Sequence, residues 1–323
     1  MLATPITFAV ESLPTLPRSR ESLERQYTNE HSAFVHVGDA RIHYREEGNP
    51  DGQTLLLIHG TYSSLHTWDE WVEILGDEFH IVRLDMPAFG LTGPRKEGEH
   101  SLGYLVDVVG EFCDELGLSD IVVAGNSLGG GVAWRLQTRR PDLVSALILI
   151  DSGGTTLVCR IIDSLASSSV LHYALTPIAV RLIIEDAYAP GNSPNPATVR
   201  RYYDLLQYPG NREAVREIAQ VYRRDYPELC GPQTMIPRPP SWHDPVPHIC
   251  DPTCISDVDV PTLFLWGSED SWLPPEFGRE LAVQIPGSRF IEYEGVGHAP
   301  MEEAPEVSAA DARQFIRSLS EQK

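Results

Sequence analysis

Residues 121–131, Ile-Val-Val-Ala-Gly-Asn-Ser-Leu-Gly-Gly-Gly, lead from an apolar run into a glycine-rich turn around Ser127. A Gly-x-Ser-x-Gly segment between a buried strand and a helix is typical of a sharp turn that projects a nucleophilic serine. Gly125 and Gly129 fit this interpretation, because a Cβ atom at either position would collide with neighbouring backbone. The helix that follows would direct its first N–H groups and its positive dipole end toward a developing oxyanion. An incidental serine, or a phosphate-binding loop, is the alternative.

Short apolar runs and helical patterns alternate on both sides of this turn. The runs cover Phe34–Val37, Arg41–Arg45, Thr54–His59, His80–Asp85, Asp120–Ala124, Ala146–Asp151, Thr262–Trp266 and Arg289–Tyr293. The helical patterns cover Leu65–Leu75, Ser101–Leu116, Leu128–Arg140, Pro275–Ile285 and Pro305–Ser318. Continuous Val, Ile and Leu runs are expected of parallel strands that are covered on both faces. The alternation predicts an α/β fold with a mostly parallel, eight-stranded sheet flanked by helices.

One interval, residues 155–256, interrupts the alternation. Its helical patterns cover Leu157–Leu175, Ile178–Tyr188, Thr198–Leu206 and Arg212–Tyr222. An insertion at this point predicts a helical cap after the sixth strand, over the carboxyl edge of the sheet where open α/β folds bind ligands. We therefore expect an N-terminal arm at 1–30, extended or partly helical, a core at 31–154 and 257–323, and a cap at 155–256.

A serine hydroxyl needs a base and an orienting acid to become an effective nucleophile. His298 lies in the loop after the last predicted strand, and Asp270 lies just beyond the strand before it. The chain order Ser127, Asp270, His298 is the order expected of a triad on a parallel α/β sheet. In such a triad, Asp270 would fix the tautomer of the imidazole. Asp151, at the end of the strand after the nucleophile helix, is the alternative acid.

The third apolar run is followed by His-Gly-Thr at residues 59–61. In a sheet of this kind one oxyanion N–H comes from the residue after the nucleophile, and another from the loop after the third strand. The sequence therefore predicts that the backbone N–H groups of Thr61 and Leu128 form an oxyanion hole. We expect the His59 side chain to brace the turn and Asp85 to play a structural part near the mouth of the site.

Several blocks of the sequence together resemble the α/β-hydrolase superfamily. They are LLLIHGTYSSLHTWDEW (55–71), RLDMPAFGLTG (83–93), VVAGNSLGGGVAW (122–134), LILIDSGG (147–154), PTLFLWGSEDSWLPP (261–275) and GVGHAPMEEAPE (295–306). The resemblance is to the capped esterase, lipase and meta-cleavage-hydrolase-like branch. It implies an α/β-hydrolase fold in which Ser127, Asp270 and His298 are the catalytic triad and Thr61 and Leu128 occupy the oxyanion positions. It implies no cofactor and no metal.

Departures from related families narrow the expected chemistry. Haloalkane dehalogenases and epoxide hydrolases of this fold have aspartate where Ser127 stands, so those activities are disfavoured. The segment HGTYSS lacks the Ser-Gly-Pro-Gly pattern of many meta-cleavage hydrolases. We therefore predict a serine hydrolase of the esterase or lipase type, which cleaves carboxylic esters through an acyl-enzyme intermediate and has a small-molecule ester as its substrate. The alternatives are a carbon–carbon hydrolase acting on meta-cleavage-type diketones, a cofactor-free haloperoxidase or perhydrolase, and a non-catalytic ligand-binding member of the fold.

Composition limits the possible partners and the location. The formal net charge of −21 argues against binding to nucleic acids or anionic membranes. The N-terminus does not resemble a secretory signal, and no stretch approaches the roughly 20 apolar residues of a membrane span. A cytoplasmic protein is the expectation, as a monomer or a dimer. Lys96 and Lys323 are the only lysines, which indicates either adaptation to high salt or a GC-rich genome.

The predicted cap carries two weaker signals. A cluster of cysteines and histidines lies near its end, at Cys230, His243, His248, Cys250 and Cys254. Their spacing matches no regular zinc site, so ordinary loop residues are favoured over a metal site or a disulfide. The apolar stretch Val170–Ile184 is a candidate for a mobile lid with an exposed apolar face.

Overall fold

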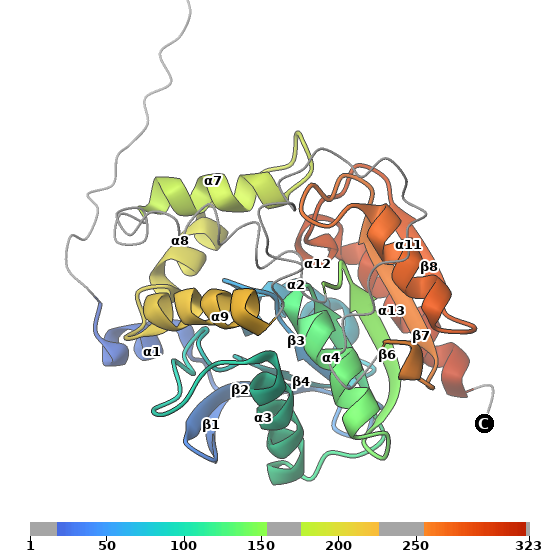
Figure 1. The fold of residues 1–323 in the computed structure, drawn as a ribbon, viewed down its shortest axis with the longest axis horizontal. Coiled ribbons are helices and arrows are strands. Elements are labelled where there is room, and N and C mark those ends of the chain that lie inside the picture. Colours follow the sequence, from blue (N-terminus) through green and yellow to red (C-terminus); the bar gives the residue numbers. More distant parts are fainter. Residues whose placement is uncertain (1–17, 154–175, 226–254, 321–323) are drawn as a thin grey trace, which may run out of the picture.

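The computed structural model describes residues 18–153, 176–225 and 255–320. Their strands form one eight-stranded sheet in the order β1-β2-β4-β3-β5-β6-β7-β8 (Figure 1). The strands are β1 (Ser32–Val37), β2 (Ala40–Gly48), β3 (Thr54–Ile58), β4 (His80–Leu84), β5 (Ile121–Asn126), β6 (Val144–Ile150), β7 (Thr262–Gly267) and β8 (Arg289–Tyr293). Only the pairs β1–β2 and β2–β4 are antiparallel. The predicted α/β fold with a mostly parallel sheet is confirmed.

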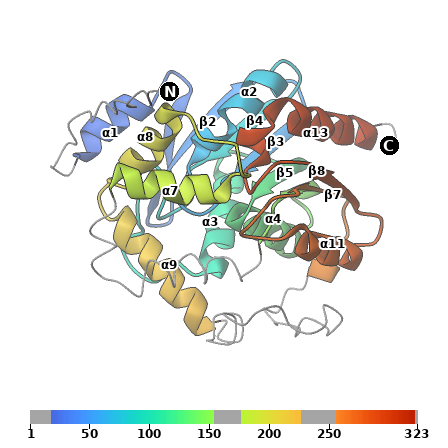
Figure 2. The same ribbon diagram turned by 90° about the horizontal axis from the view of Figure 1, so that it is seen from above.

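Helices cover both faces of the sheet (Figure 2). One face carries α3 (Leu102–Glu115), α4 (Leu128–Arg139) and α11 (Pro275–Gln284), and the other carries α2 (Asp69–Leu75) and α13 (Pro305–Ser320). Short elements beside them are η1 (Leu65–Trp68), η3 (Ile255–Asp257) and α12 (Pro300–Glu303). Every residue of β5 is buried, and its apolar run Ile121–Ala124 suits a strand that lies between two helical layers.

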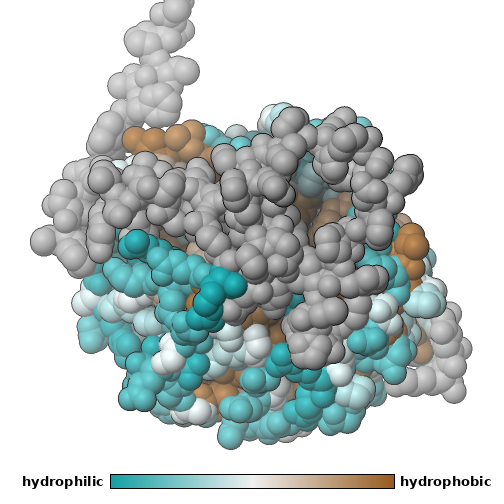
Figure 3. All heavy atoms as spheres, viewed as in Figure 1, coloured by the Kyte–Doolittle hydropathy of each residue, from teal (hydrophilic) through white to brown (hydrophobic). Residues whose placement is uncertain are grey.

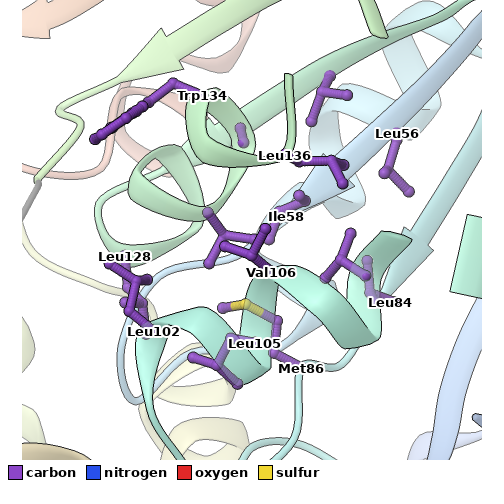
Figure 4. Packing of buried hydrophobic residues seen from close by; sticks show 14 of the residues in the cluster. Leu56, Ile58, Leu84, Met86, Leu102, Leu105, Val106, Leu128, Trp134 and Leu136 are labelled. Carbon is purple, nitrogen blue, oxygen red and sulfur yellow. The ribbon is translucent and has the colours of Figure 1, made fainter. Parts of the chain in front are cut away.

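The core on the α3 side shows how the central strands are held (Figure 4). Ile58 of β3 and Leu84 of β4 lie against Val106 of α3 and Leu136 of α4, and all four are at most 1% exposed. Burial of each such side chain contributes about 1.5–3 kcal/mol. The strand ends that carry the candidate site therefore rest on a closely packed base.

Three helices, α7 (Pro177–Ala187), α8 (Pro196–Leu205) and α9 (Asn211–Asp225), lie in the chain between β6 and β7. We call them the insertion helices. They coincide closely with three of the helical patterns in the sequence. In Figure 1, α7 lies along the top of the molecule, with α8 and α9 below it on the left. Asn195 and Thr176 cap two of them by accepting hydrogen bonds from backbone N–H groups. The predicted helix at 157–175 and the cysteine–histidine cluster at 230–254 lie outside the described residues.

The described part of the N-terminal arm contains one helix, α1 (Arg20–Tyr27). It packs against α8 through Asp204, whose side chain is fully buried and accepts hydrogen bonds from Arg18 and from the Tyr27 hydroxyl, the latter at 2.9 Å. Leu23 is buried in the same contact. None of the helices in the described ranges is long and apolar enough to cross a membrane.

Candidate active site

Ser127 lies in the sharp turn between β5 and α4, with φ 54° and ψ −117°. A positive φ is strained for a residue with a Cβ atom, and strain of this kind is common at functional sites. A Cβ atom on Gly125 would lie 2.4 Å from the carbonyl oxygen of Gly129, and one on Gly129 would lie 2.2 Å from that of Ile58. Only glycine fits at either position, as the sequence predicted.

His298 and Asp270 meet through a hydrogen bond of 2.7 Å between Nδ1 and Oδ2. The other oxygen of Asp270 accepts hydrogen bonds from the backbone N–H groups of Trp272 and Leu273, both at 2.8 Å. These contacts fix the carboxylate, which in turn favours the tautomer with the proton on Nδ1. Nε2 of His298 is buried and has no hydrogen-bond partner among the described residues. Its lone pair is therefore available to accept a proton.

Ser127 and His298 line the same pocket. Its empty volume is about 660 Å³, which includes space open to solvent. The walls are mostly apolar and aromatic side chains, namely Tyr62, Val180, Ile183, Ile184, Ala187, Tyr188, Tyr202, Leu206, Trp272, Ala299 and Met301. None of the described lining residues is Asp, Glu, Lys or Arg. The pocket is thus suited to an uncharged, largely apolar ligand.

The predicted oxyanion residues come from two segments: Leu128 follows Ser127 directly, and Thr61 lies in the loop after β3. Leu128 is the first residue of α4, and the N-terminal N–H groups of a helix have no intrahelical acceptor. Its side chain points into the core instead of the pocket (Figure 4), so only its backbone is available to a ligand. Thr61 lines the pocket, and Gly60 lets this loop approach, since a Cβ there would lie 3.0 Å from Cβ of Ser127.

Comparison with known proteins identifies the family of the chain. The model of the alpha/beta hydrolase family matches residues 55–311, most of the chain. The chain belongs to the alpha/beta hydrolase family. The fold, the resemblance drawn from the sequence and the family match therefore agree.

Individual relatives of this alpha/beta hydrolase are distant. The uncharacterized hydrolase YugF of Bacillus subtilis is 22% identical over 296 residues, which span 87% of this chain and 96% of that protein. Haloalkane dehalogenase 2 of Mycobacterium tuberculosis is 26% identical over 279 residues, 84% of this chain and 89% of that protein. A solved structure of a membrane phospholipase A, a bacterial virulence factor, has a TM-score of 0.68 and 25% identity, and covers 90% of this chain and 86% of that one.

A second carboxyl group, that of Asp151, lies beside Asp270 in this alpha/beta hydrolase. It follows β6, it is fully buried, and its Oδ1 accepts a hydrogen bond of 3.0 Å from Gly267 N–H. Burial and the neighbouring charge of Asp270 raise the pKa of Asp151 well above its usual range. Atoms of Asp151, Asp270 and His298 lie within 4.8 Å of one another, as the ligands of a metal ion would. The His298 Nδ1 contact to Asp270 and the raised pKa of Asp151 favour a hydrogen-bonded group instead.

His59 and Asp85 brace the loops below the pocket. Nδ1 of His59 lies 2.7 Å from the carbonyl oxygen of Gly60, and Nε2 accepts a hydrogen bond of 3.0 Å from Met86 N–H. Burial lowers the pKa of His59, so the ring stays neutral, as both contacts require. Asp85 accepts hydrogen bonds of 2.8 Å from the N–H groups of Leu65 and Leu91. Both side chains therefore have the structural parts expected from the sequence.

The Asp85 carboxylate also belongs to a second line of aspartate, histidine and serine, which sequence reasoning missed. Nδ1 of His43 lies 2.7 Å from Oδ2 of Asp85, and Nε2 of His43 lies 3.2 Å from Oγ of Ser32. None of the three lines the pocket around Ser127. Ser32 also accepts a hydrogen bond from Arg45, so its oxygen is committed to the structure. This second Ser–His–Asp arrangement therefore provides a control for the proposed triad.

The end of α7 is joined to the loops that carry His298 and Asp270. The backbone N–H of His298 donates a hydrogen bond of 2.7 Å to the carbonyl oxygen of Ala187. Nε1 of Trp272 donates one of 2.8 Å to the carboxylate of Asp186. A Cβ atom on Gly297 would lie 2.4 Å from the Ala187 oxygen, so the two segments lie in direct contact. No pattern in the sequence indicated this contact.

The far side of α7 is exposed and apolar. Ile178 is 69% exposed and Leu182 is 61% exposed, and hydrophobic residues colour the upper edge of the molecule over this helix in Figure 3. The described part of the predicted lid, residues 176–184, is therefore amphipathic, with Val180 and Ile184 turned into the pocket. Residues 170–175 lie outside the described ranges.

Proposed function

We propose that the chain is a serine hydrolase that cleaves carboxylic esters through an acyl-enzyme intermediate on Ser127. The observation that carries the proposal is the shared pocket: a serine in a strained turn and a histidine held by a buried aspartate line one apolar cavity. Nucleophile, base and orienting acid are the three parts that acyl transfer to serine requires.

The proposed cycle assigns each residue one step. Oγ of Ser127 attacks the ester carbonyl carbon while Nε2 of His298 accepts the serine proton. Asp270 stabilises the imidazolium, and the N–H groups of Thr61 and Leu128 donate hydrogen bonds to the oxyanion. His298 then protonates the departing alcohol. Water attacks the acyl-enzyme with His298 again as the base, which releases the acid and restores Ser127.

The pocket supports ester hydrolysis over the alternatives. A meta-cleavage-type dienoate carries a carboxylate, and no cationic side chain among the described lining residues would pair with it. Dehalogenation by Ser127 would leave an alkyl ether on the serine, which water does not hydrolyse under ordinary conditions, whereas an acyl ester is readily hydrolysed. The structural likeness to a phospholipase A, an ester hydrolase by its name, points the same way.

We further propose that residues 155–256 form the cap, over a core of residues 31–154 and 257–323, with the arm at 1–30. This proposal is supported by the residues that form the pocket wall, because Val180 and Ile184 belong to α7 and Tyr202 belongs to α8. In this arrangement the core carries the chemistry and the insertion sets which acyl groups fit.

The test compares Ser127→Ala with Ser32→Ala. A nitrophenyl ester series measures turnover, and a fluorophosphonate probe with mass spectrometry identifies the modified serine. We expect Ser127→Ala to lose labelling and to lose activity by on the order of 10⁴-fold or more. Ser32→Ala, which removes the serine of the other Ser–His–Asp line, should retain both. Near-normal ester turnover or labelling in folded Ser127→Ala would show that the assignment is wrong.

A further inference from the structure

A pair of hydroxyl groups lies in the mostly apolar wall of the pocket. Ser63, in the loop after β3, and Tyr202 of α8 both line the cavity, and their hydroxyl oxygens lie 3.1 Å apart. Tyr202 continues the contact to Glu302 of α12, whose Oε1 lies 3.0 Å from the tyrosine oxygen. The result is a chain of hydrogen bonds from the pocket surface into the protein.

Glu302 fixes the direction of this chain. An ionised carboxylate accepts hydrogen bonds and donates none. Three hydroxyl groups surround it: Thr67 at 2.6 Å and Tyr202 at 3.0 Å on Oε1, and Tyr188 at 2.5 Å on Oε2. Each of the three must therefore direct its proton to Glu302. Burial and the charge of Glu302 raise the pKa of Tyr202 above its usual range, so the phenol keeps its proton.

The direction of the hydrogen bond between Ser63 and Tyr202 follows from that between Tyr202 and Glu302. The single phenolic proton of Tyr202 is committed to Glu302, so the contact of 3.1 Å requires Ser63 to be the donor. The other acceptor near the Ser63 hydroxyl is the carbonyl oxygen of Ser64, at the limiting distance of 3.5 Å. In either case the proton of Ser63 points to protein, and its lone pairs remain for a ligand in the pocket.

Asn126 reinforces this polarity. Its amide nitrogen donates hydrogen bonds to the carbonyl oxygens of Ile150 and His298, at 3.2 and 3.1 Å, which uses both of its protons. Its side-chain oxygen is left as an acceptor at the pocket that Asn126 also lines. Two polar side chains beside Ser127 thus offer acceptors to a ligand, among described lining residues that include no Asp, Glu, Lys or Arg.

We propose that this pocket selects neutral esters whose acyl chain carries a hydroxyl group, which donates a hydrogen bond to Ser63. The acyl group is the part specified because it stays attached to Ser127 between the two half-reactions. The inference rests on the proposed ester hydrolysis and adds its substrate class. In this proposal Ser63 of the core and Tyr202 of the insertion helices determine specificity, and the contact between their hydroxyl groups connects the two parts.

The experiment compares ethyl hexanoate with its 3-hydroxy, 6-hydroxy and 3-oxo derivatives by pH-stat titration of purified full-length protein. We expect kcat/KM for one hydroxy ester to exceed that of ethyl hexanoate by about tenfold, near the upper limit for one neutral hydrogen bond. Ser63→Ala should reduce this ratio to within about threefold. Tyr203→Phe, a neighbouring tyrosine outside the pocket lining, is the matched control and should leave the ratio unchanged.

Tyr202→Phe tests the direction of the hydrogen bonds. Without the phenol oxygen, the Ser63 hydroxyl keeps only the Ser64 carbonyl oxygen, at the limiting 3.5 Å, as a protein acceptor and can donate to a ligand instead. The 3-oxo ester should therefore gain relative to ethyl hexanoate in this variant compared with wild type. Equal kcat/KM values for plain and hydroxy esters in an active wild type would overturn the inference alone. A gain found only with 2-hydroxyethyl hexanoate, whose hydroxyl is in the alcohol, would overturn the acyl assignment. Failure to hydrolyse any ester would instead contradict the proposed function.

Discussion

Gly129→Ala perturbs the candidate site without removing any functional group. A Cβ atom at Gly129 would lie 2.2 Å from the carbonyl oxygen of Ile58 and 2.5 Å from that of His59, and Cβ atoms essentially never approach closer than 3.0 Å. The start of α4 and the end of β3 must therefore separate by about 0.8 Å or more. Thr61 follows β3 and Leu128 starts α4, so the displacement falls between the two proposed oxyanion donors.

A misplacement of about 1 Å at a reacting centre costs on the order of 10²-fold in rate, and so does the loss of one oxyanion donor. We expect kcat for a nitrophenyl ester to fall about 100-fold in Gly129→Ala, with a smaller change in KM. Steady-state kinetics measures the fall, and thermal unfolding shows whether the variant is folded at the assay temperature.

Gly103→Ala is the matched control for this substitution. Gly103 is also in a helix, α3, but its Cβ would meet Arg139 at an ordinary 3.6 Å. This variant should keep wild-type kcat and gain up to about 1 kcal/mol of stability from the better helix former. A folded Gly129→Ala with kcat within about threefold of wild type would refute the reasoning that links this close contact to catalysis.

Three aspartates give further predictions. The raised pKa of Asp151 means that the native state holds a proton which the unfolded state loses above about pH 4, so this group's stabilising contribution is lost as pH rises through the native pKa. Denaturant unfolding should show the stability of Asp151→Asn gaining on that of wild type as pH rises from about 4 toward the native pKa of Asp151; parallel curves of stability against pH would contradict this. Burial opposes ionisation of Asp85, but His43 and backbone N–H groups outweigh it and hold its pKa well below the usual range. Asp85→Asn should lower the free energy of unfolding by about 3 kcal/mol at pH 7, and by less as pH falls through the native pKa of Asp85. A loss of stability that does not depend on pH would contradict this prediction. Asp204→Ala should release α1, detected as faster proteolysis at residues 18–28, since it leaves Arg18 without its buried carboxylate; an unchanged cleavage rate would show that the arm is held elsewhere.

The parts of the site that sequence predicted are those fixed by local geometry or by sheet topology. The glycines around Ser127 follow from the steric demands of one turn, which a few neighbouring residues determine. Asp270 and His298 follow two adjacent strands, β7 and β8, and parallel strands bring their carboxyl ends to one edge. Their proximity could therefore be expected before any distance was known.

The parts that sequence did not predict depend on contacts between distant segments. Ser63 and Tyr202 are 139 residues apart, and Tyr202 and Glu302 are 100 apart, so no periodicity connects them. The neighbouring carboxyl groups of Asp151 and Asp270 follow the adjacent strands β6 and β7, but whether they share a site depends on backbone angles such as the φ of 40° at Asp151. Side-chain packing of the insertion on the core decides such contacts, and a single sequence does not encode it in a readable pattern.

The hydrogen bond from His298 N–H to the carbonyl oxygen of Ala187 has a mechanical consequence. The same helix that ends at Ala187 supplies Val180 and Ile184 to the pocket wall. If α7 swung outward far enough to widen the entrance, that bond would break and the main chain of the proposed base would lose its anchor. Entry of a substrate and proton transfer by His298 would then occur in different states. The pocket would be either open to solvent or aligned for reaction. Opening and closing of the pocket would then be a step of the catalytic cycle: opening would release His298 from its anchor, and closure would restore its position.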